Sequence, residues 1–171
     1  MKNIVLIGFM GTGKSTVGRR LAHRLNRKFI DTDTEIESIT GKTVTQIFAR
    51  HGVVRFRSEE ALLVKKLALQ EGLVISTGGG MVLDPENVRL LKSNGVLIGL
   101  KAMPEVIFNR LKKKKNRPLL AKGDLKEQIE NLLMERRNVY DVADYTVDTG
   151  EFPQEKVVEM IVAYLKEKQE L

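Results

Sequence analysis

The stretch GFMGTGKST, from Gly8 to Thr16, comes directly after the apolar run NIVLI at residues 3–7. It fits the pattern G-x-x-x-x-G-K-[ST] with Gly8, Gly13, Lys14 and Ser15. Apolar residues recur at helical spacing downstream of it, so the stretch connects a predicted buried strand with a predicted helix. In this context the pattern predicts a phosphate-binding loop.

Each residue type in the stretch has a physical reason to be in such a loop. Glycines let backbone N–H groups turn toward an anion without Cβ clashes, and the next helix points its positive end at the same place. Lys14 would place a charge on the terminal phosphates, and the Ser15 hydroxyl would ligate Mg²⁺. The other interpretation, a glycine-rich turn with a chance lysine, is disfavoured by the flanking strand and helix. The loop therefore predicts binding of a nucleoside triphosphate.

The class of nucleotide-binding protein is narrowed by what else the sequence contains. The chain has no N-K-x-D element that would read guanine, and its 171 residues are few for a motor ATPase. A small-molecule kinase fits this size. It needs a phosphate cradle, a carboxylate for the metal, an acceptor pocket and a cover that excludes water.

Strands and helices alternate along the chain, which predicts an α/β fold of three layers. We expect a five-stranded, mainly parallel sheet between two layers of helices. No repeat or linker divides the chain, so we expect one kinase domain over residues 1–171. The predicted strands are 3–7, 28–33, 73–77, 96–100 and 145–148. The predicted helices are 15–25, 34–41, 43–69 with a break near 51–54, one capped by Asp84 and starting at Pro85, one from Pro104 to the lysine run, 125–140 and 153–168.

The charge balance favours anionic partners but does not choose among them. The formal net charge is +7, from 29 basic and 22 acidic residues. Aromatic residues make up only 5% of the chain and no nucleic-acid-binding motif is found, so we expect no nucleic-acid partner. The lysine run at 112–115 fits either a solvated helix end or a role facing phosphate, and the sequence leaves both open.

The cellular setting is predicted from absent features. The chain has no cysteines, so nothing indicates an oxidising compartment. The apolar run at the N-terminus is too short for a signal peptide, and no run reaches the ~20 residues of a membrane span. We therefore expect a cytoplasmic protein with no membrane partner.

Four shorter motifs follow the phosphate loop, and each has an ordinary structural interpretation beside a functional one. In DTD (31–33), the two aspartates end a strand, where they would bind ligands or cap the next helix. In FRSEE (56–60), an arginine and a glutamate three apart would face a ligand or pair with each other. The glycines of TGGG (77–80) would allow close approach of a ligand or form a tight turn. In NRPLL (116–120), the arginine would belong to a lid or be a loop charge.

The ordered set of motifs resembles the shikimate kinases. It consists of GFMGTGKST, DTD, FRSEE, TGGG, NRPLL and RRNVYDVAD (136–144), and it spans nearly the whole chain at similar spacing. The resemblance implies a P-loop kinase fold of the nucleoside-monophosphate-kinase type, with a substrate-binding region at about 31–60 and a mobile lid at about 112–124. It also implies a monomer that uses ATP and Mg²⁺ to phosphorylate the 3-hydroxyl of shikimate.

The same resemblance implies a role for each matching residue. The phosphate loop would be Gly11, Thr12, Gly13, Lys14, Ser15 and Thr16, with Ser15 and, through water, Asp31 on the metal. Adenine would lie against Arg110 and the loop from Asp148 to Pro153. Shikimate would be bound by Asp33, Arg57, Glu60, Gly79, Gly80 and Arg136. Catalysis would rest on Lys14, on Asp33 at the acceptor hydroxyl and on Arg117 at the transferring phosphate.

Two stretches depart from what the resemblance leads us to expect. The lid segment KKKKNRPLLAKGD is rich in lysine, and Arg55 lies close to Arg57, which makes the assignment of the carboxylate-binding arginine less unique. A gluconate-type or nucleotide kinase shares the fold and the loop. The acceptor motifs favour a hydroxylated carboxylic acid instead, because arginine grips a carboxylate through two parallel bonds.

Overall fold

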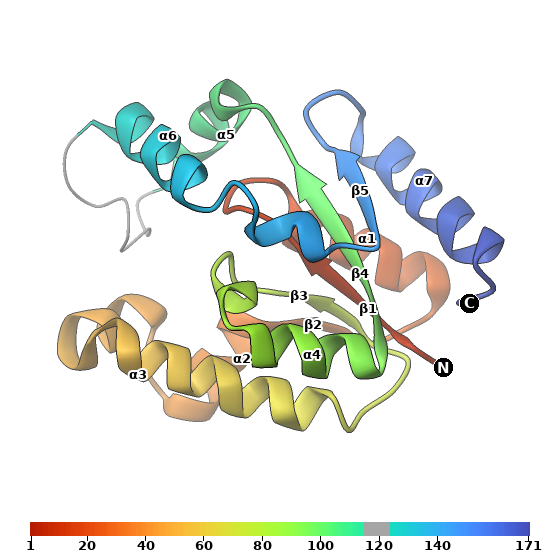
Figure 1. Cartoon of the computed structure of the whole chain (residues 1–171), viewed down its shortest axis with the longest axis horizontal. Coiled ribbons are helices and arrows are strands. Elements are labelled where there is room, and N and C mark those ends of the chain that lie inside the picture. The colour runs from red at the N-terminus through yellow and green to blue at the C-terminus, as the bar shows by residue number, and fades with distance from the viewer. Residues whose placement is uncertain (115–123) are drawn as a thin grey trace.

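In the computed structural model of the chain, which describes residues 1–114 and 124–171, five parallel strands form one sheet in the order β2-β3-β1-β4-β5 (Figure 1). The four pairings between neighbouring strands are all parallel. The strands are β1 (Asn3–Ile7), β2 (Phe29–Asp31), β3 (Val74–Ser76), β4 (Gly95–Lys101) and β5 (Tyr145–Asp148). The predicted α/β fold class is confirmed.

The parallel order brings the strand ends that carry the sequence motifs together. In the central pairings, Leu6 of β1 lies beside Ser76 of β3, and Ser76 lies beside Asp31 of β2. The phosphate loop and the turns after β2 and β3 therefore meet at the carboxyl edge of the sheet. Open α/β sheets bind their ligands at this edge.

Helices cover both faces of the sheet, so the three predicted layers are present (Figure 1). The helices are α1 (Lys14–Leu25), α2 (Thr32–Thr40), α3 (Val44–Leu67), α4 (Pro85–Ser93), α5 (Pro104–Leu111), α6 (Leu125–Glu135) and α7 (Gln154–Glu167). One core cluster contains Val17 and Leu21 of α1 with Val157 and Ile161 of α7. A second, on the opposite face, contains residues of α2, α3 and α4. A third small cluster joins α5 and α6 to the phosphate loop through Phe9.

The predicted break in the long helix is confirmed and lies at one residue. Within α3, Gly52 has φ 76° and ψ 178°, which is not helical. Glycine tolerates this positive φ, whereas a residue with a Cβ is strained there. The first half of α3 is thereby turned relative to the second half, which carries Arg57 and Glu60.

Two predicted boundaries are wrong, and each has a local cause. The second strand ends at Asp31 and not at Asp33, because an Asp31 carboxylate oxygen accepts the N–H of Thr34 at 3.2 Å and starts α2. The helix predicted over 125–140 ends at Glu135, since Arg136 leaves helical geometry with φ −101°. A short 3₁₀ turn, Val139–Val142, follows it.

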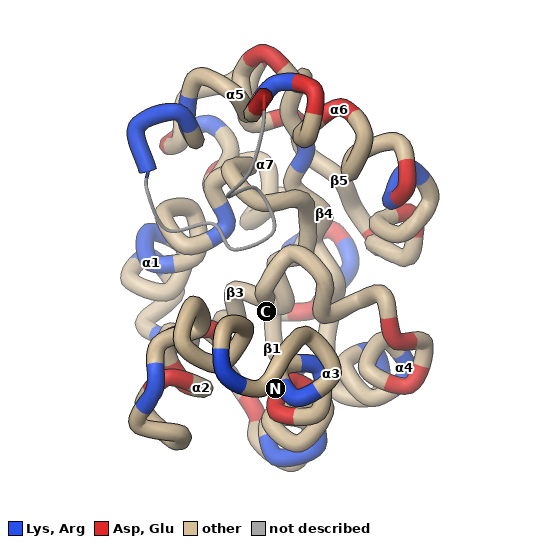
Figure 2. Tube along the Cα trace, turned by 90° about the vertical axis from the view of Figure 1, so that its left-hand side faces the viewer, with Lys and Arg blue, Asp and Glu red and all other residues tan. Residues whose placement is uncertain are grey.

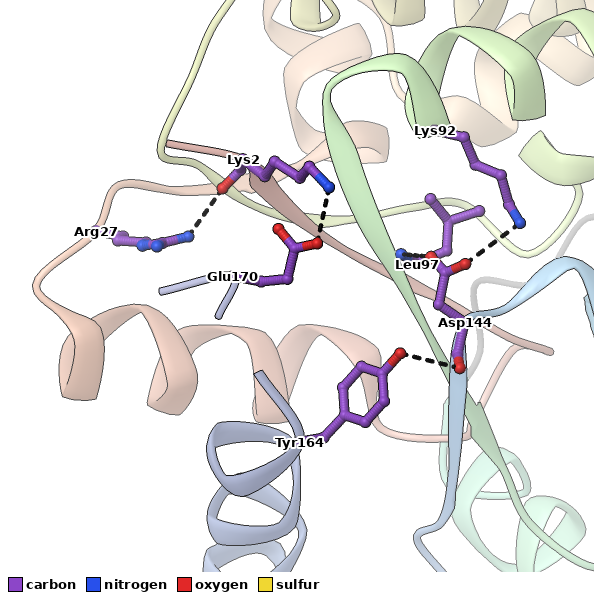
Figure 3. Close-up of polar contacts among 7 residues, drawn as sticks. All are labelled: Lys2, Arg27, Lys92, Leu97, Asp144, Tyr164 and Glu170. Atoms are coloured by element: carbon purple, nitrogen blue, oxygen red, sulfur yellow. Dashed lines mark hydrogen bonds and ion pairs between the residues drawn. The ribbon is translucent and has the colours of Figure 1, made fainter. Parts of the chain in front are cut away.

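The amino edge of the sheet, opposite the motifs, is held by side-chain contacts between distant segments (Figure 3). The Asp144 carboxylate accepts the backbone N–H of Leu97 at 2.8 Å and pairs with Lys92 at 3.4 Å. The Tyr164 hydroxyl donates to the carbonyl of Asp144 at 3.2 Å. These contacts fix the start of β5 against β4 and α7.

The two chain ends also meet at this edge, where Lys2 pairs with Glu170 at 2.7 Å (Figures 1 and 3). Among the described helices, none combines the length and apolar character that a membrane crossing requires.

Candidate active site

The phosphate loop has the backbone that its glycines predict. Gly8, Gly11 and Gly13 have φ of 147°, 77° and 98°, all positive. Lys14 is buried, and its ammonium group donates to the carbonyls of Gly8 and Phe9 at 2.8 and 2.9 Å. The lysine is therefore held across the mouth of the loop, directly beside the backbone that would cradle phosphates.

A hydroxyl and a carboxylate meet beside the first turn of α1. The Ser15 hydroxyl donates to an Asp31 carboxylate oxygen at 2.6 Å and lies 3.3 Å from the Ser76 hydroxyl. Among the described residues, no group of three or more His, Cys, Asp or Glu side chains forms a metal-binding cluster. One carboxylate and one hydroxyl are nevertheless what Mg²⁺ uses in nucleotide sites, where phosphates and water complete the coordination. The residues present fit this metal.

A cavity of about 320 Å³ lies on the other side of the loop, with Gly11, Thr12, Gly13, Thr16 and Arg110 in its lining. Phe152 and Gln154, the neighbours of Pro153, also line it. Five of the predicted nucleotide-binding residues thus line one cavity, whereas Lys14 and Ser15 do not line it. Pro153 lies between two lining residues as the N-cap of α7.

Arg110 and Thr149, which both line this cavity, make a set of hydrogen bonds that the sequence did not predict. The Arg110 guanidinium donates to the carbonyl of Gly11 at 3.1 Å and to the carbonyl of Thr149 at 2.8 Å. The Thr149 hydroxyl donates to the carbonyl of Thr12 at 2.6 Å. Both side chains tie the phosphate loop to the segment after β5.

The lysine run is partly described. Figure 2 shows it as a basic segment at the end of α5, where the described chain stops before the grey trace. Lys114 lines the same cavity of about 320 Å³ as Arg110. The ammonium group of Lys112 lies 5.9 Å from the centre of the Phe108 ring. Arg117 and most of the predicted lid, 112–124, lie outside the described residues.

A second cavity, of about 450 Å³, opens beside the phosphate loop at the carboxyl ends of β2 and β3. Its charged residues are Asp33 and Glu37 of α2, Arg57 and Glu60 of α3, and Arg136 after α6. Its apolar wall includes Met10, Val44, Phe48 and Phe56. Residues from 10 to 136 in the chain therefore face one space whose volume suits a small ligand.

The arginine and glutamate of FRSEE pair with each other and still face this cavity. The Arg57 guanidinium donates to Glu60 Oε1 at 2.5 Å. Glu60 is fully buried, and its other oxygen, Oε2, has no hydrogen-bond partner in the described part of the chain. Burial raises the pKa of Glu60 from 4.5 to about 7, and the charge of Asp33 adds to the rise while Arg57 and Arg136 oppose it.

Arg55 does not compete with Arg57 for this position. It pairs with Glu59 at 2.8 Å, and neither residue lines the cavity. The ambiguity between the two arginines in the sequence is resolved in favour of Arg57, because only one side of α3 faces the cavity.

The TGGG turn comes close to the charged side chains of the cavity. A Cβ added to Gly80 would lie 2.2 Å from the Arg57 guanidinium, and one on Gly78 would lie 2.8 Å from Asp33 Oδ1. A side chain at either glycine would therefore displace Arg57 or Asp33 from its present position. Gly78 was not among the predicted site residues, although the run of three glycines was the signal for it.

Arg136 is the second arginine of the cavity, and it is 5% exposed. Its Nη1 is buried and has no hydrogen-bond partner among residues 1–114 and 124–171. A buried guanidinium nitrogen without an acceptor is costly, so a bound anion would satisfy it.

The two cavities adjoin at the phosphate loop. A Cβ on Gly79 would lie 3.4 Å from the backbone nitrogen of Met10 and 3.7 Å from the carbonyl of Gly8. Met10 lines the cavity of about 450 Å³, called the acceptor cavity below. The next residue, Gly11, lines the cavity of about 320 Å³, called the nucleotide cavity. A group held in one cavity is thus close to a group held in the other, which is what direct transfer between two ligands requires.

The chain has close relatives among known proteins. The family model described as Shikimate kinase matches residues 10–166. A shikimate kinase from Pelotomaculum thermopropionicum is 71% identical over 167 residues, which cover 98% of this chain and 97% of that protein. One from Desulforudis audaxviator is 58% identical and is covered to 88%, again with 98% of this chain.

Solved structures agree with these relatives. The structure of a shikimate kinase from Acinetobacter baumannii in complex with shikimate has a TM-score of 0.93 at 37% identity, and the match covers 98% of this chain and 94% of that one. A gluconokinase structure from Sinorhizobium meliloti, at 17% identity and a TM-score of 0.60 with 97% and 92% coverage, shares the fold alone.

Proposed function

The chain belongs to the shikimate kinase family, so its reaction is the transfer of the terminal phosphoryl group of ATP to the 3-hydroxyl of shikimate, and we propose that the two adjoining cavities carry it out. The observation that supports this most strongly is the meeting of Arg57, Arg136 and Asp33 in one cavity beside the phosphate loop. Two guanidinium groups and a carboxylate suit an acid that also carries hydroxyls.

The acceptor is bound through its carboxylate. Arg57 and Arg136 come from different elements and together orient the acid, and the buried Nη1 of Arg136 gains the acceptor that it lacks. Glu60 holds the Arg57 guanidinium in place through their hydrogen bond. The backbone of Gly79 and Gly80 forms the floor against which the ring of the acid lies.

The nucleotide is bound in the other cavity. The backbone N–H groups of the loop and the ammonium group of Lys14 hold the phosphates. Lys14 already lies across the loop mouth, so the phosphates would share it with the carbonyls of Gly8 and Phe9. Arg110 and the segment up to Pro153 would contact the adenine.

Ser15 and Asp31 would hold Mg²⁺, Asp31 through water. When bound, the metal neutralises charge on the β- and γ-phosphates. The hydrogen bond between the two side chains keeps the oxygens that would hold the metal on the same side of the loop before any metal binds.

In the transfer step, the 3-hydroxyl oxygen forms a bond to the γ-phosphorus while the bond from that phosphorus to the bridging oxygen of ADP breaks. Asp33 orients the hydroxyl and accepts its proton. Arg117 stabilises the charge on the transferring oxygens, as trans-acting arginines do in related reactions. The outcome is shikimate 3-phosphate and ADP.

A coupled assay of ADP release tests the proposal with shikimate, quinate, gluconate and nucleoside monophosphates side by side. We expect turnover with shikimate to exceed that with each other acceptor by at least tenfold, since Arg57 and the buried Arg136 reject neutral or differently placed groups. Faster turnover with gluconate or a nucleotide would refute the acceptor assignment and support the related kinase classes.

We also propose that the enzyme is one domain, acts as a monomer in the cytoplasm and has no nucleic-acid partner. Sedimentation at micromolar concentration should give the mass of one chain, 19.3 kDa, and a gel-shift assay in moderate salt should show no bound DNA or RNA. A stable dimer would contradict the first expectation, and salt-tolerant binding the second.

A further inference from the structure

Tyr140 lies next to the acceptor cavity, where it bonds to Gly79 of the lining, and it packs against α5 and α6. It belongs to the 3₁₀ turn that follows α6, and its ring packs against both the α3–α4 cluster and the α5–α6 cluster. Its hydroxyl donates to the carbonyl of Gly79 at 2.7 Å. The residue therefore connects the glycine turn under the acceptor with a segment 61 positions later in the chain.

Arg136 completes this arrangement. Arg136 precedes Tyr140 by four residues and is the C-cap residue of α6. Its carbonyl accepts the backbone N–H of Val139 at 3.0 Å. Arg136 Nη1 lies 3.6 Å from the place of a Cβ on Gly79. The pKa of Tyr140 is raised by burial, and the nearby charge of Arg136 opposes the rise. Tyr140 and Arg136 thus both approach Gly79, Tyr140 at its carbonyl and Arg136 on the side where a Cβ would lie.

The other side of the glycine turn is anchored separately. The Thr32 hydroxyl accepts the backbone N–H of Gly78 at 2.9 Å, and Thr32 is fully buried. The turn is held by α2 at Gly78 and by Tyr140 at Gly79.

We propose that Tyr140 is a positioning residue for the acceptor: its hydroxyl holds the carbonyl of Gly79 and thereby keeps the Arg136 guanidinium aimed into the cavity. This inference rests on the proposed function, in which Arg136 binds the acid's carboxylate. Tyr140 itself is not among the residues that line the cavity. It acts through Arg136 and the turn, so its effect falls on acceptor binding and not on ATP.

Tyr140→Phe tests this inference because it removes the hydroxyl and keeps the ring between the two clusters. Loss of one hydrogen bond to a partly buried carbonyl changes an equilibrium by about three- to tenfold. We expect the KM for shikimate to rise by that factor, with the KM for ATP nearly unchanged.

The matched control is Tyr164→Phe. It also loses one hydroxyl that donates to a backbone carbonyl, that of Asp144, but at the amino edge of the sheet (Figure 3). We expect both KM values of this variant to equal those of the unmodified enzyme. If the two variants changed the shikimate KM equally, the effect would be general and the inference would be overturned.

A double-mutant cycle with Arg136→Lys separates this inference from the function on which it rests. If Arg136→Lys leaves the shikimate KM unchanged, the proposed role of Arg136 fails. If Arg136→Lys raises it and Tyr140→Phe does not, the role of Tyr140 alone fails. We expect both to raise it, and the effect of Tyr140→Phe to shrink to less than twofold in the Arg136→Lys background, because the residue that Tyr140 positions is gone. Fully additive effects would overturn the inference.

Discussion

Replacing Glu60 with glutamine should change how the stability of the protein depends on pH. Glu60 is fully buried, and burial raises the pKa of its carboxyl from 4.5 to about 7. Below pH 4.5 the group is neutral in both the folded and the unfolded chain. As the pH rises, the unfolded chain loses the proton first, so the folded state loses stability between about pH 4.5 and pH 7.

The size of this effect follows from the pKa change. Each pKa unit corresponds to about 1.4 kcal/mol, so the rise from 4.5 to about 7 costs the folded state about 3 kcal/mol above pH 7. Glutamine keeps an oxygen that accepts from Arg57 but does not titrate. The difference in unfolding free energy between Glu60→Gln and the unmodified protein should therefore shift by about 3 kcal/mol from pH 4.5 to pH 8, in favour of the variant.

Urea unfolding of both proteins at half-unit steps across this range measures the difference directly. Glu59→Gln is the matched control, because it removes the neighbouring carboxylate, which pairs with Arg55 outside the cavity. A difference between Glu60→Gln and the unmodified protein that stays constant with pH would refute the reasoning. So would the same pH-dependent shift in the control.

The remaining predictions concern ligand binding, catalysis and stability. Arg57→Ala should raise the shikimate KM at least tenfold and leave the ATP KM nearly unchanged, because a charged hydrogen bond is worth about 1.5–3 kcal/mol; equal loss for both substrates would indicate a damaged fold. Gly80→Ala should also raise the shikimate KM, since its Cβ would lie 2.2 Å from the Arg57 guanidinium and displace it. An unchanged shikimate KM would show that acceptor binding does not depend on the present position of Arg57. Arg117→Ala should lower kcat by roughly 100-fold or more with little change in ATP affinity, and unchanged turnover would remove Arg117 from the mechanism. Asp144→Ala should cost about 1–3 kcal/mol in urea unfolding, because the N–H of Leu97 loses its acceptor; an unchanged midpoint would contradict this, and the kinetic constants serve as the control.

Local patterns in the sequence were sufficient for the layers and the phosphate loop. The loop motif is contiguous, and its glycines permit the positive φ values that the loop adopts. The alternation of strands and helices is also a local signal, since the periodicity of apolar residues reports burial on one face. The helix boundary at Arg136 was missed because the apolar spacing continues to Tyr140, while the chain leaves the helix to turn these side chains toward Gly79.

The charged residues of the site were also identified from the sequence, but only through the resemblance to a family. The spacing of Arg57 and Glu60 allowed a simple surface pair, and the nearby Arg55 made the assignment to Arg57 less unique. The packing of α3 distinguished the two arginines, because Arg57 lines the cavity while Arg55 pairs with Glu59 on the same helix and does not line it.

The sequence by itself determined the residue types, the parallel sheet and the loop that binds phosphate. The tertiary structure alone decided which distant groups meet: Arg110 with the carbonyl of Gly11, 99 residues away, and Tyr140 with that of Gly79, 61 residues away. It also decided that Glu60 loses its contact with water and so binds its proton more tightly. The reason is physical, since periodicity reports only the environment of one element, whereas a contact or a pKa depends on how several elements pack around the same point.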